Sequence, residues 1–241
     1  MSGMILADLR RIMRKKGFYI TLLILMIFLL LDKFGTALVD ADEVINRDMR
    51  RTGVIYILIP LIFIVLSVFG DDERSRTPLS LIGCGITRQA LIIGKMIDGT
   101  LLMCIYFVLA APVKYGMIRL LGVPLSDRQI RLLMFFHAFC FLRAIACLAL
   151  SMLAFVLLES LIPANITAVM VSLFTSNIFR LVQTVYHIGI FRATSLGLVE
   201  EAHANLSVGN MPWQLLPLFI FYICLPVLAA VLVYRNKELE L

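Results

Sequence analysis

Long apolar runs, separated by short polar segments, make up most of the chain. Six runs reach or approach the roughly 20 residues that a helix needs to cross about 30 Å of hydrocarbon. A transmembrane β-barrel would instead show segments of about 10 residues with alternating polarity. The pattern therefore predicts six membrane-spanning helices, over residues 18–39, 54–70, 97–121, 132–158, 166–190 and 213–234.

Composition narrows the class of protein further. The 241 residues are 61% hydrophobic and only 16% charged, with a mean hydropathy of +0.97. Soluble domains are about 45–50% apolar and about 25% charged, and one soluble core of this size could not cover so much apolar surface. These values exclude a soluble enzyme, a disordered chain and a secreted disulfide scaffold. We predict an all-α polytopic membrane protein with a single transmembrane domain over residues 1–241.

The first span has an alternative interpretation as a cleaved signal peptide. Its basic front and the apolar core 18–31 fit that class, and Val39-Asp40-Ala41 resembles a cleavage site. However, Asp32 and Lys33 follow the core directly, and the possible cleavage site lies ten residues beyond it. We therefore expect an uncleaved anchor.

Lysine and arginine counts predict the orientation, because cytoplasmic segments carry more of these residues. With the N-terminus inside, the cytoplasmic segments hold 11 and the outer segments 8, with the remaining three inside spans. The basic cluster ahead of the first span dominates this bias. We expect both termini in the cytoplasm, and we interpret the net charge of +6 as a topology signal, not as evidence of nucleic-acid binding.

Residues 4–16 carry a helical pattern of their own. Apolar positions recur at the spacing of one helix face, and basic positions lie largely opposite. The apolar set is Ile5, Leu6, Leu9, Ile12 and Met13, and the basic set is Arg10, Arg11, Arg14 and Lys15. This pattern predicts an amphipathic helix in the cytoplasmic interface of the membrane; the alternative is a positive anchor without a defined helix.

We find no catalytic or metal-binding motif. The three histidines (His137, His187 and His203) form no H-E-x-x-H pattern, and the five scattered cysteines include no C-x-x-C. Gly94-Lys95 lacks the rest of a phosphate-binding loop, since Gln89 and Met96 occupy the other required positions. We therefore expect a non-catalytic chain without a metal site or a nucleotide site.

The segment between the second and third spans, residues 71–95, has the most specific pattern. It reads as a charged start, a short apolar turn, a glycine-rich break and a second amphipathic segment. Because it is longer than a bare hairpin needs, we expect a short helix across the cytoplasmic membrane face. The alternative is a solvated charged loop that has no partner.

The order of residues in this segment resembles the loop after the second span of ABC type-2 permeases, which are the membrane subunits of exporter-type ABC transporters. Glu73 matches an acidic position, Thr77 a threonine, Ile86-Thr87-Arg88 an Ile-Ser-Arg motif, and Gly94-Lys95 a Gly-Lys pair. Arg76 and Gly85 depart from the usual Gly and Pro. In that family the loop forms a coupling helix that docks on a separate ATPase. The resemblance implies this role for Asp72, Glu73, Arg74, Thr77, Leu79, Leu81, Ile82 and Arg88.

The resemblance extends to the layout of the whole chain, that of small bacterial peptide and drug export permeases. It implies two permease chains around a shared pathway, two cytoplasmic ATPase subunits that bind ATP and Mg, and no cofactor on this chain. It also implies a multi-pass protein of a bacterial inner membrane that exports cytotoxic or antimicrobial peptides or hydrophobic drugs. The alternatives are a stand-alone secondary transporter, for which we find neither related halves nor intramembrane acids, and a non-transporting membrane scaffold.

Charged and polar residues inside the spans are candidates for the pathway or the dimer seam. Arg143 lies near mid-membrane, where ionisable groups are costly and often functional. Glu159, on the same helix, is about 24 Å away at 1.5 Å per residue. Span five carries a polar stripe at helical spacing: Asn177, Arg180, Thr184 and His187. Either set could contact substrate or only join helices, and we expect Lys114 to snorkel to a span end.

The segment 191–212 mixes apolar and acidic residues and is too broken to span a membrane. A re-entrant or interfacial hairpin on the outer side fits this pattern, and it could gate the outer exit. The alternative is a simple outer loop.

Overall fold

A computed structural model describes residues 2–33, 55–75, 83, 85–120, 122, 125–186, 194–208 and 210–236. The prediction of an all-helical chain is confirmed over these ranges, which contain no strand. The elements, in chain order, are α1 (Ser2–Met13), α2 (Lys16–Lys33), α4 (Ile55–Ser75), α6 (Arg88–Leu120), α7 (Asp127–Leu158), α8 (Leu161–Val169), the π-helix η1 (Met170–Phe174), α9 (Thr175–Tyr186), α10 (Ser195–Val208), the 3-10 turn η3 (Trp213–Leu215) and α11 (Leu216–Asn236).

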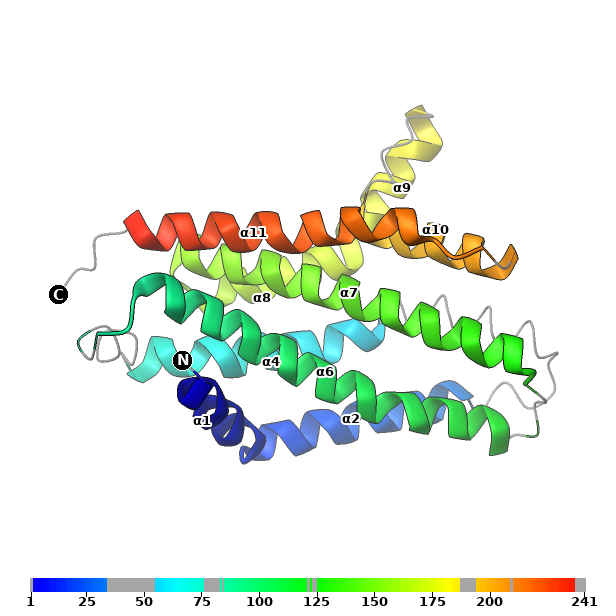
Figure 1. The fold of residues 1–241 in the computed structure, drawn as a ribbon, viewed down its shortest axis with the longest axis horizontal. Helices are drawn as coiled ribbons and strands as arrows, with labels where there is room; N and C mark the ends of the chain where they lie inside the picture. Colours follow the sequence, from blue (N-terminus) through cyan, green and yellow to red (C-terminus); the bar gives the residue numbers. More distant parts are fainter. Residues whose placement is uncertain are drawn as a thin grey trace.

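The two longest helices, α6 and α7, form the centre of the bundle (Figure 1). α7 packs against α11, α8, α10, α6 and α4, while α6 also packs against α2, α11 and α1. Both central helices carry fully buried apolar side chains, such as Leu102 on α6 and Ala144 on α7. The core of the molecule therefore lies between these two helices and the helices that flank them.

Each of the six predicted apolar stretches overlaps a helix of the structure. Among the described residues, four helical runs are long and apolar enough to cross a membrane: Arg88–Leu120, Asp127–Leu158, Leu161–Tyr186 and Trp213–Asn236. Two shorter apolar helices cover Lys16–Leu31 and Tyr56–Gly70. This set of apolar helices fits a membrane protein. The predicted continuation of the first span over 34–39 lies outside the described residues.

The helices around the predicted coupling segment extend further than the apolar pattern indicated. α4 continues through its charged end to Ser75. α6 begins at Arg88, nine residues before the predicted start at 97, and Gly94-Lys95 therefore lies inside it. The Thr87 side chain caps this start, because its hydroxyl accepts the Ala90 amide at 3.3 Å. Of the segment 71–95, only residues 76–87 lie between the two helices.

A connection of two residues joins α7 to α8. α7 begins with a capping box, in which Ser126 and Gln129 satisfy each other's backbone amides. It ends at Glu159, whose backbone is left-handed with a φ of 50°. Ser160 then caps α8, so the fifth helical run begins at residue 161 and not at 166. Pro163 falls in the first turn of α8, where a helix tolerates proline.

α9 and α10 differ in how far the bundle covers them. α9 projects away from the other helices in Figure 1, and Leu181 and Tyr186 are 65% and 67% exposed. α10 instead lies against α7, with Leu198 and Val199 almost fully buried. Within the expected re-entrant segment 191–212, the structure thus has one helix that is packed on the bundle.

Candidate functional site

Most of the predicted coupling residues cannot be placed as side chains. Asp72, Glu73 and Arg74 belong to the last turn of α4, but only their backbone is described, and Thr77, Leu79, Leu81 and Ile82 lie outside the described residues. Arg88, the remaining member, is the first residue of α6 and is half-buried. The ends of α4 and α6 therefore bracket the predicted coupling segment on both sides.

An ion pair fixes α1 to the same end of α6. The Lys95 ammonium lies 2.9 Å from the Asp8 carboxylate, and the side chain of Lys95 is only 3% exposed. Asp8 also pairs with Arg11, one turn further along α1, at 3.2 Å. One carboxylate thus holds a cation from each of two helices.

The apolar face of α1 packs on protein. Ile12 is 1% exposed, and Leu9 and Met13 pack against the core beside it. Leu6, nearer the N-terminus, remains 67% exposed. The predicted amphipathic pattern therefore serves to dock α1 under the bundle, and only a minor part of its apolar surface is left for a membrane.

Arg143 is a fully buried charge of the bundle, as is Asp98 on α6. It is 0% exposed, and its Nη2 donates a hydrogen bond of 2.9 Å to the main-chain carbonyl of Ser172 in η1. Its Nε and Nη1 have no hydrogen-bond partner among the described residues. This hydrogen bond joins α7 to the π-helical turn. A buried charge with so few partners is costly. Within the single chain it is closed off from any open pathway.

The polar stripe of the fifth helical run lies on α9, past the π-helix. Asn177 and Thr184 are exposed, and the Asn177 side-chain amide donates back to the Leu173 carbonyl at 2.7 Å. Only the backbone of Arg180 is described, and His187 lies outside the described residues. Arg143 and this stripe do not form one site, because Arg143 is covered while the stripe is open.

Lys114 is buried and does not snorkel. It is 2% exposed, and its Nζ lies 5.8 Å from the ring centroids of both Tyr56 and Tyr115. Cation–π contacts of this kind stabilise an ammonium away from water. The prediction that this lysine reaches a span end is wrong, because the aromatic rings of α4 and α6 cover it.

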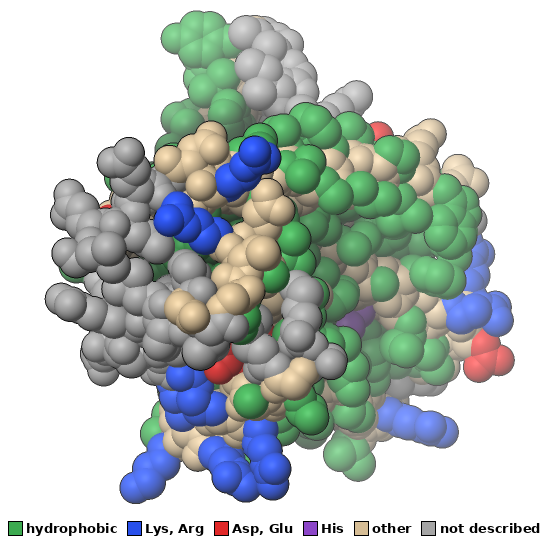
Figure 2. All heavy atoms as spheres, turned by 60° about the vertical axis from the view of Figure 1, so that its left-hand side comes forward, with side chains coloured by type: hydrophobic (Ala, Val, Ile, Leu, Met, Phe, Trp, Pro, Cys, Tyr) green, Lys and Arg blue, Asp and Glu red, His purple; other side chains and the backbone are tan. Residues whose placement is uncertain are grey.

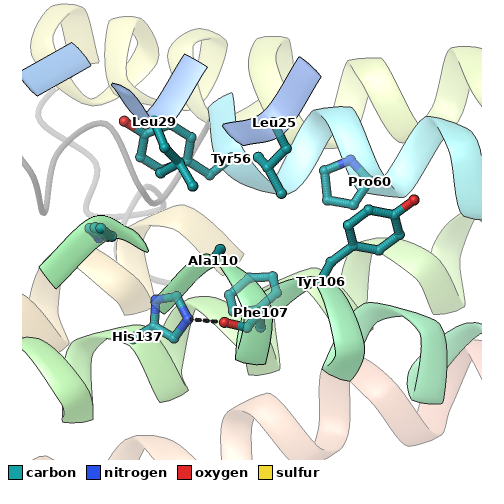
Figure 3. A pocket seen from close by; sticks show the side chains of 9 residues that line it. Leu25, Leu29, Tyr56, Pro60, Tyr106, Phe107, Ala110 and His137 are labelled. Carbon is teal, nitrogen blue, oxygen red and sulfur yellow. Dashed lines mark hydrogen bonds between the residues drawn. The ribbon is translucent and has the colours of Figure 1, made fainter. Parts of the chain in front are cut away.

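Lys114 also lines a small apolar cavity between α2, α4, α6 and α7. Figure 3 shows Leu25 and Leu29 facing Phe107 and Ala110 across it. At one wall, the His137 Nε2 lies 3.1 Å from the Phe107 carbonyl. The His137 imidazole therefore joins α7 to α6 through a hydrogen bond.

Among the described residues, the buried charges are Lys95 in the α1–α6 ion pair, Asp98 on the same helix, Arg143 at its contact with Ser172, and Lys114 at the apolar cavity. No group of three or more potential metal ligands gathers anywhere in the described ranges. Comparison with protein-family models, with curated proteins and with solved structures finds no match to this chain.

Sequence reasoning missed Asp8 and singled out Lys95 only as part of a motif. A signal for Asp8 exists, because it is the one acid in an otherwise basic segment and stands three residues before Arg11. Its pairing with Lys95, 87 residues away, depends on how α1 docks and has no signal in the local pattern.

Proposed function

We propose that the chain is the transmembrane permease subunit of an ATP-driven ABC exporter. The observation that carries this proposal is the order of residues 71–95, which matches the coupling loop of ABC type-2 permeases at the acidic, threonine, apolar, Ile-Thr-Arg and Gly-Lys positions. In this proposal the chain itself is not an enzyme. Two cytoplasmic ATPase subunits bind ATP and Mg and dock on the coupling residues.

Helix continuity supports a mechanical role for that loop. The charged end of α4 adds five residues beyond Gly70, or about 7.5 Å at 1.5 Å per residue. Arg88 lies seven residues ahead of Lys95, or about 10 Å by the same rise. A displacement of residues 76–87 would therefore pass into both helices through unbroken backbone. ATP can bias such a motion only through its different affinity for two arrangements of the ATPase.

The exposed surface of α9 supports a second copy of the chain, or a related chain, as partner. Asn177 and Thr184 are exposed on the polar side of the amphipathic helix α9, and exposed polar groups are costly against lipid. In the proposed dimer this stripe faces the seam or the pathway, together with Arg180 and His187. The proposed substrate is an amphipathic or lipophilic molecule, such as a cytotoxic or antimicrobial peptide or a hydrophobic drug.

Co-purification of an ATPase tests the proposal. The affinity-tagged full chain is purified from the membranes of its own cells, and ATP hydrolysis is measured in the eluate. Leu81→Asp with Ile82→Asp is expected to remove the co-purifying ATPase. The matched control is Leu120→Asp, which adds the same kind of charge at the other end of α6, where residue 120 is 82% exposed.

The control is expected to retain the ATPase at the level of the unaltered chain. A chain that never co-purifies with an ATPase would overturn the proposal in favour of a stand-alone transporter or a scaffold. An ATPase that remains bound to the Leu81 and Ile82 double variant, with unchanged turnover, would remove the coupling role from this loop.

A further inference from the structure

One face of α1 forms an open hollow at the end of the bundle. It is open to solvent, and its lining follows the helical spacing of a single face: Gly3, Leu6, Ala7, Arg10, Arg11 and Arg14. Small and apolar residues line the first half, and guanidinium groups line the second. The hollow is therefore amphipathic along its length.

Two of the three arginines are available to a ligand. Asp8 holds Arg11 at 3.2 Å, whereas Arg10 and Arg14 are exposed and form no ion pair within the described ranges. The Arg14 amide donates to the Arg10 carbonyl at 3.3 Å, so the two residues lie one turn apart at the end of α1. Lysine and arginine side chains gather along the lower edge of Figure 2, the side on which α1 lies in Figure 1.

The hollow adjoins the start of the apolar helix α2. Only Arg14 and Lys15 separate α1 from α2, so Arg14 is within about 7 Å of the start of the apolar helix. Tyr19 and Ile20, in the first turns of α2, are 60% and 55% exposed and mark where apolar surface begins. With α2 inserted in a membrane, the arginines would lie near its headgroup layer.

We propose that this hollow binds the headgroup of an anionic phospholipid. Arg10 and Arg14 donate to the phosphate oxygens, a geometry that guanidinium groups favour, and the exposed Leu6 contacts the glycerol and upper acyl region. Charge complementarity and the adjoining apolar surface favour a lipid over a soluble anion. The inference does not depend on the proposed export function, since it concerns only α1 and the membrane.

Native mass spectrometry of the full chain in detergent tests the site with two added lipids, phosphatidylglycerol and phosphatidylcholine. The unaltered chain is expected to bind phosphatidylglycerol more tightly. Arg10→Gln with Arg14→Gln should lower the affinity for phosphatidylglycerol by about 25-fold, taking about 5-fold for each cation near a lipid surface. The affinity for phosphatidylcholine should not change.

The matched control is Arg128→Gln with Arg131→Gln. It removes the same charge from exposed arginines at the start of α7, at the other end of the bundle, and it is expected to change phosphatidylglycerol binding less than 2-fold. Equal losses of phosphatidylglycerol affinity in the two double variants would mean that the lipid is attracted to any cations of the chain. That result would overturn the site. Arg10→Lys with Arg14→Lys keeps the charge, so its loss should be only a few-fold. If the glutamine variant fails to fold, the lysine variant still tests whether the guanidinium groups bind the lipid.

A last arm separates a lipid from a free phosphate. Inorganic phosphate at millimolar concentration is expected to leave phosphatidylglycerol bound. Leu6→Gln is expected to lower the affinity for this lipid. If phosphate displaces the lipid completely and Leu6→Gln has no effect, the hollow is a site for a soluble anion and the lipid assignment is wrong.

Discussion

The Lys95 ammonium of α6 lies 2.9 Å from the Asp8 carboxylate of α1, although 87 residues separate the two along the chain. The lysine is almost completely covered, while the carboxylate is 18% exposed and shared with Arg11. This contact holds α1 against the start of α6, next to the ends of the helices that bracket residues 76–87. α1 is therefore fixed to the helix that follows residues 76–87 in the chain.

Asp8→Asn should destabilise the chain more than Lys95→Met. The asparagine leaves a buried ammonium without its carboxylate, and removal of one partner of a partly buried pair costs on the order of 1–3 kcal/mol. Methionine removes the buried charge itself and leaves Asp8 with Arg11. Thermal unfolding of the purified chain in detergent measures both variants. If Asp8→Asn leaves the stability unchanged, the fully buried Asp98, one turn along α6, has replaced Asp8 as the partner of Lys95.

Arg143→Met should be tolerated far better than Arg143→Ala. Methionine keeps the volume and removes a buried charge whose acceptor is the Ser172 carbonyl, a change that is often close to neutral. Alanine leaves a cavity in a core position, which costs about 2–5 kcal/mol. The midpoint of thermal unfolding ranks the two variants. If methionine is as damaging as alanine, the charge itself is needed to hold η1.

Cysteine labelling should separate Arg143 from the polar stripe of α9. In a background without native cysteines, Thr184→Cys is expected to react with a water-soluble maleimide in detergent, since that position is exposed. Arg143→Cys is expected to stay unlabelled, because the residue is 0% exposed. Fast labelling at position 143 would show that a water-filled path reaches it, and would return Arg143 to the candidates for substrate contact.

Two glycines of the same helix should respond in opposite ways to alanine. A Cβ at Gly99 would lie 2.7 Å from Leu148 Cδ2 and 3.4 Å from Ile64 Cγ2, whereas a Cβ at Gly116 would meet nothing within 4 Å. Gly99→Ala therefore forces the buried Leu148 side chain to shift within the core and should destabilise by about 1–3 kcal/mol. Gly116→Ala gains helix propensity of about 0.5–1 kcal/mol. Unfolding midpoints that shift in the same direction would contradict the close packing at Gly99.

The left-handed residue between α7 and α8 offers a further matched pair. Glu159 has a φ of 50°, a conformation that costs a side chain with a Cβ about 1 kcal/mol. Glu159→Gly should therefore be more stable than Glu159→Ala by about that amount, since both variants lose the carboxylate and only one keeps the Cβ. Equal stability of the two variants would mean that the turn relaxes out of the left-handed region.

The apolar pattern predicted where helices occur better than where they end. It predicted a helix at each of the six runs, because burial in lipid and burial in protein both require apolar residues. It placed the start of α6 nine residues late, because Arg88 and Gln89 are polar and the cap that starts the helix is a single hydroxyl at Thr87. Polar helix ends carry little hydropathy signal.

The buried charges were harder to predict, because their partners are not encoded nearby. The sequence predicts Arg143 near mid-membrane, but it does not indicate the acceptor, which is a backbone carbonyl in a π-helical turn 29 residues later. Lys114 was expected at a span end. Its cover includes Tyr56 on another helix, so only the packing of α4 on α6 could identify it.

The π-helical turn at Met170–Phe174 has one more consequence, which concerns helical phase. A π-helical turn holds an additional residue, and each residue of an α-helix advances the side chain by about 100°. Every side chain of α9 is therefore rotated relative to the direction that counting from Leu161 would give. Deletion of a single residue within the turn would swing Asn177 and Thr184 by about a quarter-turn while leaving their own spacing intact. The direction in which α9 presents its polar face is thus set by one inserted residue several positions away.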